Sequence, residues 1–152
     1  MRLAGVTEQG DTVVVWITRR LLDRLLSQLA ELLENATTQV LGVNPTRTHA
    51  MQSFAQQAAQ LASAPQKPVR PQAEDAQWLV HSVDIAYARG DVRLTLRGGD
   101  AQHVDLDFVE DKLRQFLNIL LEAYRAADWP LTAWPAWARS SSRHADSLAQ
   151  IH

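Results

Sequence analysis

Five histidines and five neighbouring acids are the side chains of this sequence that could bind a metal or move a proton. The histidines are His49, His81, His103, His144 and His152. No two of them are four residues apart, as a helical zinc motif requires. The acids are Asp100, Asp105, Asp107, Glu110 and Asp111, which lack the glycine and the spacing of a calcium loop. We therefore expect neither a metal site nor a cofactor.

The usual signatures of an enzyme are also missing from this sequence. There is no cysteine, which excludes a thiolate nucleophile and a disulfide framework. Gly98 and Gly99 suit a turn better than a phosphate-binding loop, and Arg89-Gly90-Asp91 is a turn between two strands. The sequence leans towards a protein that is not an enzyme. One alternative is a ligand pocket between sheet and helices, supplied by His81, Tyr87 and Arg93.

Tryptophans cluster near the end of the sequence. Three of the five, Trp129, Trp134 and Trp137, stand among prolines that are expected to keep the segment from being helical. Tryptophan is enriched at the centres of protein interfaces. The sequence thus predicts a partner or dimer interface here, and the alternative is that these rings pack on their own domain.

Composition and charge narrow the class of protein. The 152 residues are 46% hydrophobic and 21% charged, with a formal net charge of −2, as in an ordinary globular protein. This charge gives nucleic acid no general reason to bind, although Arg89, Arg93 and Arg97 line one strand face. No basic segment followed by an apolar run is visible, and charges interrupt the apolar stretches. We expect a bacterial, cytoplasmic protein with no membrane contact.

The first half of the sequence predicts a hairpin followed by two helices. Strands are expected at Leu3–Val6 and Thr12–Ile17, and the β-branched second run suits a central strand covered on both faces. Thr18 is a plausible cap for a leucine-rich helix that ends near 35–38. A second helix over 46–62 has a thinner and more polar face, which we expect on the outside of the domain. Its apolar positions are Met51, Phe54, Ala55, Ala58 and Leu61.

The second half predicts strands and one further helix. Residues 63–75 form a proline-rich connector, and alternating residues then indicate strands over 79–87 and 92–97, with a short strand around Val104. Asp107 and Glu110 are spaced as a capping box for a helix that ends near Asp128.

These elements predict an α+β fold. We expect a mainly antiparallel sheet of four or five strands with leucine-rich helices packed on one face. The same order of elements occurs twice: a strand, a Gly-Asp turn, a second strand and a leucine-rich helix. A duplicated unit would explain this repeat. The domain is expected to span 1–137, with a polar C-terminal tail at 138–152.

The function that follows from this pattern is an interaction rather than a reaction. We expect a non-catalytic protein-interaction protein, of adaptor, assembly-factor or inhibitor type, that acts as a homodimer. Its partners would be itself and another protein. The alternative is a small-ligand-binding module or enzyme that uses the pocket named above.

Overall fold

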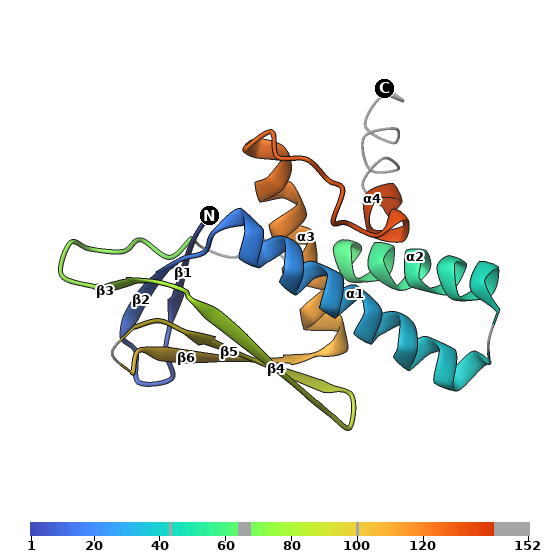
Figure 1. Ribbon diagram of the computed structural model, residues 1–152, viewed down its shortest axis with the longest axis horizontal. Coiled ribbons are helices and arrows are strands. Elements are labelled where there is room, and N and C mark those ends of the chain that lie inside the picture. Colours follow the sequence, from blue (N-terminus) through green and yellow to red (C-terminus); the bar gives the residue numbers. More distant parts are fainter. Residues whose placement is uncertain (43, 64–67, 100, 142–152) are drawn as a thin grey trace. The chain divides into compact units, whose positions relative to one another are not determined.

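The computed structural model describes residues 1–42, 44–63, 68–99 and 101–141. This part of the chain contains six strands and four helices, which confirms the α+β class (Figure 1). The chain divides into two compact units. The strand unit comprises Met1–Leu22 and Ala64–Val109, and the helical unit comprises Asp23–Ser63 and Glu110–His152.

The first sheet of the strand unit is a hairpin with a third strand added in parallel. Its strands are β1 (Arg2–Val6), β2 (Thr12–Trp16) and β3 (Ala76–Leu79), in that order. β2 pairs antiparallel with β1 and parallel with β3. Consecutive residues Val14 and Val15 are both buried, so β2 is covered on both faces, as its β-branched run predicts.

The second sheet is antiparallel and has one apolar and one polar face. Its strands are β4 (Ser82–Ala88), β5 (Asp91–Arg97) and β6 (His103–Val109), in that order. On the central strand β5, Val92, Leu94 and Leu96 are buried, while Arg93 and Arg97 between and beyond them are exposed. The alternation seen in the sequence therefore correctly predicts which face of β5 is buried and which is exposed.

The prediction of one sheet with four or five strands is wrong, because the six strands form two sheets of three. The division falls within the alternating run 79–87. The backbone N–H of Val80 donates to the carbonyl of Trp16 in the first sheet at 2.8 Å. That of His81 donates to the carbonyl of Arg97 in the second sheet at 2.7 Å. The burial pattern shifts by one residue at this transfer, since Val80 is buried, His81 and Ser82 are both exposed, and Val83 is half-buried. Interpreting 79–87 as one alternating strand misses this shift.

The two hairpins that suggest a duplicated unit are closed by different turns. Residues 7–11 join β1 to β2, with Gly10 at φ 92°. Only Arg89 and Gly90, at φ 55° and 92°, join β4 to β5, as in a two-residue hairpin loop. The second hairpin also continues into β6 before its helix begins. Duplication of the hairpin-plus-helix unit therefore stays a hypothesis that rests on the shared order of the elements.

The helices are α1 (Arg19–Leu41), α2 (Pro45–Leu61), α3 (Glu110–Ala126) and α4 (Ala136–Ser141). Thr18 caps α1 as predicted, because its Oγ1 accepts from the N–H of Leu21 at 3.3 Å. α1 continues past its predicted end at 35–38. The predicted capping role of Asp107 is wrong, since this residue lies in β6 and pairs with Arg93.

The expectation that prolines keep the tryptophan segment from being helical is confirmed for 128–135, which contain no helix, but is wrong for Trp137, which lies in α4. Pro135 directly precedes α4, and a proline at a helix start loses no intrahelical hydrogen bond. The predicted boundary between 137 and 138 falls inside α4, and residues 142–152 lie outside the described residues. Part of the predicted connector, 64–67, lies outside them as well, whereas 68–75 contains neither helix nor strand.

Leucines from α1 and α3 supply most of the core of the helical unit. Those that are almost fully buried are Leu25, Leu26, Leu29, Leu33, Leu113, Leu117, Leu120 and Leu121. Burying each such side chain contributes roughly 1.5–3 kcal/mol. α2 packs against α3 and α4 within the same unit (Figure 1). None of the helices in the described ranges has the length and apolar character needed to cross a membrane.

Candidate functional site

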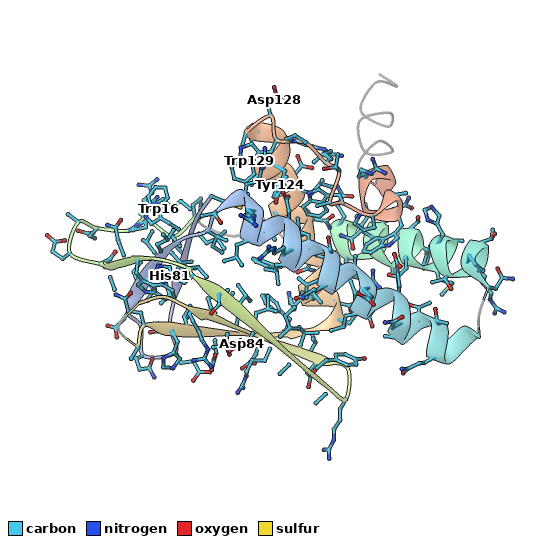
Figure 2. The ribbon with its side chains drawn as sticks, in the orientation of Figure 1. Trp16, His81, Asp84, Tyr124, Asp128 and Trp129 are labelled. Carbon is cyan, nitrogen blue, oxygen red and sulfur yellow. The ribbon has the colours of Figure 1, made fainter. Side chains whose placement is uncertain are left out.

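The tryptophans singled out by the sequence pack on residues of their own helical unit. Trp134 and Trp137 are 3% and 2% exposed, and Trp129 is half-buried. Trp129 and Trp134 meet the ring of Tyr124 edge to face, with ring centroids 5.0 and 5.5 Å apart. Figure 2 labels Tyr124 and Trp129 of this group. The Tyr124 hydroxyl donates to Asp23 Oδ1 at 2.9 Å. Trp134 and Trp137 therefore offer almost no side-chain surface to a second chain in this conformation.

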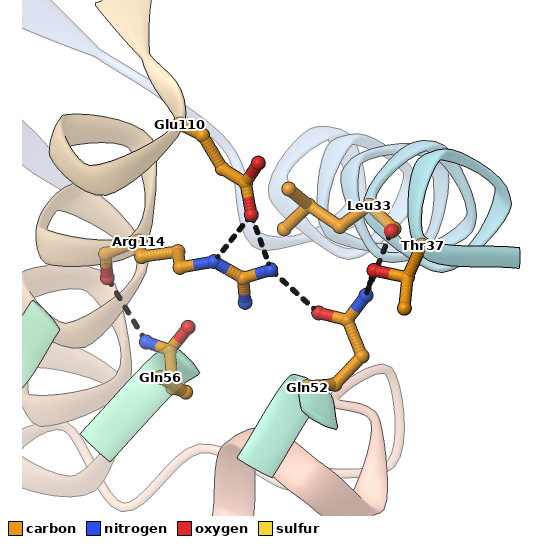
Figure 3. A network of polar contacts seen from close by, with 6 residues as sticks. All are labelled: Leu33, Thr37, Gln52, Gln56, Glu110 and Arg114. Atoms are coloured by element: carbon orange, nitrogen blue, oxygen red, sulfur yellow. Dashed lines mark hydrogen bonds and ion pairs between the residues drawn. The ribbon is translucent and has the colours of Figure 1, made fainter. Parts of the chain in front are cut away.

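A buried arginine lies at the centre of a polar network between α1, α2 and α3 (Figure 3). Arg114 is 1% exposed, and its Nε and Nη2 donate to Glu110 Oε1 at 3.0 and 2.7 Å. Nη2 also donates to Gln52 Oε1 at 2.7 Å. The amide nitrogen of Gln52 donates to the Leu33 carbonyl and to Thr37 Oγ1, both at 2.7 Å. A buried charge needs such partners to offset its lost hydration.

Two further contacts tie α2 and α4 to this arginine. The Gln56 amide nitrogen donates to the backbone carbonyl of Arg114 at 2.9 Å and to Asn118 Oδ1 at 2.8 Å. The ring centroid of Trp137 lies 5.8 Å from the guanidinium carbon of Arg114, within the range of a cation–π contact. The network thus holds the glutamine face of α2 inward.

The outer face of α2 is apolar, which reverses the usual pattern of a surface helix. Its buried side chains are Thr48, Gln52, Gln56 and Ala59. Its exposed face carries what we term the α2 stripe: Met51, Phe54, Ala58 and Leu61. Phe54 and Leu61 are 68% and 88% exposed. The expectation that the thinner face lies outside agrees with this arrangement, but the burial of the glutamines is not evident from the sequence.

A pocket of about 350 Å³ opens beside the N-terminus of α2 in the helical unit. Its walls come from Glu34, Asn35 and Thr38 of α1, the start of α2 with its cap Asn44, and Trp137 of α4. The indole N–H of Trp137 donates to Glu34 Oε1 at 2.8 Å. Almost every side chain of this wall can form hydrogen bonds, so the pocket suits a polar ligand.

The structure does not bring together the three residues predicted to line a ligand pocket. Tyr87 faces Val92 on the apolar side of the second sheet. Arg93, the next residue on β5, points to the opposite face, because side chains alternate along a strand. His81 precedes β4 at the other end of the strand and is exposed (Figure 2). Tyr87 and Arg93 therefore cannot line one pocket.

The polar face of the second sheet is occupied by cross-strand pairs. Arg93 Nε and Nη2 donate to the two carboxylate oxygens of Asp107 at 2.6 and 2.9 Å, and Arg97 Nε donates to Asp84 at 2.6 Å. The hydrogen bond from Arg93 lowers the pKa of Asp107, and the same contact raises the pKa of Arg93. Arg93 and Arg97 are thus paired with acidic side chains, as arginines on an exposed strand face commonly are.

The described residues contain no group of three or more histidine, aspartate or glutamate side chains that could hold a metal ion. The chain matches no family model, no curated protein and no solved structure. The α2 stripe and the polar pocket are thus the two candidate sites of the helical unit.

Proposed function

We propose that this protein is a non-catalytic interaction protein that acts as a homodimer, and that the α2 stripe is its contact surface. The observation that supports this is the outward direction of the stripe while polar side chains occupy the inner face of the same helix. A clustered, exposed apolar face is typical of an interaction site in a folded protein.

The spacing of the stripe favours another helix as the occupant. Met51, Phe54, Ala58 and Leu61 follow one another at steps of three, four and three residues. This is the a/d spacing with which two helices pack along a narrow seam. The same surface on a second copy supplies an identical seam, as a two-fold dimer requires.

The charges on α2 favour an antiparallel arrangement of the two copies. α2 contains no acid, and Arg47 is an exposed cation in its first turn, in line with the stripe. In a parallel pair the two copies of Arg47 would lie side by side and repel. In an antiparallel pair each Arg47 lies near the C-terminal end of the partner helix, where the helix dipole favours a cation.

The first test measures the mass of the full chain in solution by light scattering across a range of concentrations. We expect a dimer for the wild type and a monomer for Phe54→Glu, which places a charge in the seam. Phe54 is mostly exposed, so its replacement should change the free energy of unfolding by only about 0.5 kcal/mol or less. Gln28→Glu, which adds the same charge at an exposed position of α1, should remain dimeric. A monomeric wild type, or a dimeric Phe54→Glu variant, would contradict the proposal.

A cross-linking test addresses the orientation, because the chain has no cysteine of its own. In the antiparallel seam Met51 of one copy faces Leu61 of the other. A mixture of the Met51→Cys and Leu61→Cys proteins should form a disulfide-linked heterodimer under mild oxidation. Met51→Cys alone should not, because its two copies would be about 15 Å apart along the helix axes, beyond disulfide reach. Efficient cross-linking of Met51→Cys alone would overturn the antiparallel arrangement.

A further inference from the structure

The pocket at the start of α2 has features of a ligand site that the dimer proposal does not explain. Its volume of about 350 Å³ is within the range of small-molecule sites, about 300–1,000 Å³. Its walls lie entirely within the helical unit, and the residues of the α2 stripe do not contribute to them.

The charge on the pocket wall comes from Glu34. This carboxylate is half-buried, and the indole N–H of Trp137 fixes one of its oxygens at 2.8 Å. No ion pair within the described ranges involves Glu34. A partly buried carboxylate without a cationic partner attracts a positive group from solution.

The hydrogen-bonding groups of the wall also favour a donor-rich ligand. Thr48 is nine-tenths buried and lines the pocket, where its hydroxyl oxygen can accept a hydrogen bond. The N-terminal end of α2 offers little to an anion. Asn44 Oδ1 already accepts from the N–H of Arg47, and Pro45 has no N–H to donate.

We propose that this pocket binds a small organic ammonium compound, with the Glu34 carboxylate as its counter-charge. An ammonium group has three N–H donors and no acceptor, which matches a wall that offers the oxygens of Glu34 and Thr48. Trp137 holds the carboxylate in the required orientation through its indole N–H. The site is independent of the dimer seam, so either proposal can fail without the other.

The test titrates the full chain with three probes of similar length, followed by amide NMR shifts at physiological ionic strength. The probes are 1,4-diaminobutane, the neutral 1,4-butanediol and the anion succinate. We expect saturable shifts of the Thr48 and His49 amides and of the Trp137 indole N–H with the diamine alone. Glu34→Gln should weaken diamine binding about tenfold or more, because the neutral amide still accepts from Trp137 but carries no charge. Glu31→Gln, which removes an exposed carboxylate from the same helix outside the pocket, should bind as the wild type does.

Several outcomes would overturn the proposal. Equal binding of the diol would show that the ammonium charge is not recognised. Binding of succinate in preference to the diamine would assign the pocket to anions instead. Failure of the diamine to saturate below about 50 mM, or equal weakening by both carboxylate variants, would show a surface charge effect rather than a site.

Discussion

The amide oxygen of Gln52 on α2 accepts a hydrogen bond from Nη2 of Arg114 on α3 at 2.7 Å, across 62 residues of sequence. Both side chains are almost fully buried. The amide nitrogen of the same glutamine reaches back to the Leu33 carbonyl of α1. One uncharged side chain therefore joins three helices and helps to hold a guanidinium group out of water.

Replacing Gln52 should destabilise the protein more than replacing Gln57 on the same helix. Gln52→Leu leaves the Leu33 carbonyl without its side-chain donor and removes one partner of Arg114, which should lower the free energy of unfolding by about 1–3 kcal/mol. Gln57→Leu alters the next turn of α2 at a half-exposed position and should change it by about 0.5 kcal/mol or less. Urea unfolding followed by circular dichroism measures both values, and equal losses would contradict this role of Gln52.

Two buried tryptophans should respond differently to the same substitution. The indole N–H of Trp137 donates to Glu34, whereas that of Trp134 is buried and has no hydrogen-bond partner in the described ranges. Trp137→Phe should therefore lower the free energy of unfolding by about 1 kcal/mol more than Trp134→Phe does. Denaturant melts of the two variants give this difference directly. A larger loss of unfolding free energy for Trp134→Phe would show that the lost ring volume, rather than the hydrogen bond, determines the destabilisation.

Gly98 is required by the close approach of a tryptophan ring. A Cβ atom at this position would lie 2.6 Å from Cε3 of Trp78, so Gly98→Ala should lower the free energy of unfolding by about 1–3 kcal/mol. Gly5→Ala is the matched control in the same unit, because a Cβ there meets no atom within 4 Å. Thermal unfolding of both variants tests this, and a stable Gly98→Ala protein would mean that Trp78 moves aside easily.

Asp128, two residues after the end of α3, has a left-handed conformation that suits glycine better. Its φ is 52°, and the N–H of Trp129 bonds the carbonyl of Tyr124 at 2.9 Å, as in a Schellman cap (Figure 2). Asp128→Gly relieves the strain of a Cβ at this φ and should raise the free energy of unfolding by about 0.5–1 kcal/mol. Asp128→Ala should instead lower it. Calorimetric unfolding of both variants checks the sign, and a loss with glycine would show that the carboxylate itself stabilises the cap.

The pair of Arg93 and Asp107 should be visible in an acid titration. Because the hydrogen bond from Arg93 lowers the pKa of Asp107, the folded protein binds this proton less tightly than the unfolded chain. Its contribution to stability is present above the ordinary carboxyl pKa of about 3.9 and is lost as the pH falls through the lowered value. Arg93→Gln should raise the pKa of Asp107 towards the ordinary value in a carboxyl NMR titration. Arg97→Gln, which frees Asp84 instead, should leave it unchanged, and an equal rise in both variants would indicate a general charge effect.

The elements themselves were largely predictable from periodicity. The leucine spacing after Thr18 and the alternation around Leu94 each identify an element and its buried face, because one face of each must leave water. The transfer between sheets at Val80 and His81 was not predictable, because it depends on the backbone carbonyls to which the N–H groups of these two residues donate. Nor was α4, whose proline looks like a helix breaker until its position at the start is known.

The candidate sites were harder to predict than the fold. A tryptophan-rich segment carries a strong compositional signal, yet burial of Trp134 and Trp137 is decided by the rings and helices around them. The α2 stripe is visible in the sequence as apolar residues at three- and four-residue steps. They lie on the side of the helix opposite Gln52 and Gln56. What holds the glutamine face inward is Arg114, whose guanidinium donates to Gln52 and whose backbone carbonyl accepts from Gln56, across 62 and 58 residues of sequence.

In the proposed dimer, the two faces of α2 would separate what the helix contributes to abundance from what it contributes to assembly. Substitutions at Gln52 or Gln56 would disturb the folded monomer and so reduce the amount of protein in a cell. Those at Phe54 or Leu61 would leave that amount nearly unchanged and alter only association. In a library of variants, a screen for protein level and a screen for self-association would therefore single out alternate positions of the same helix.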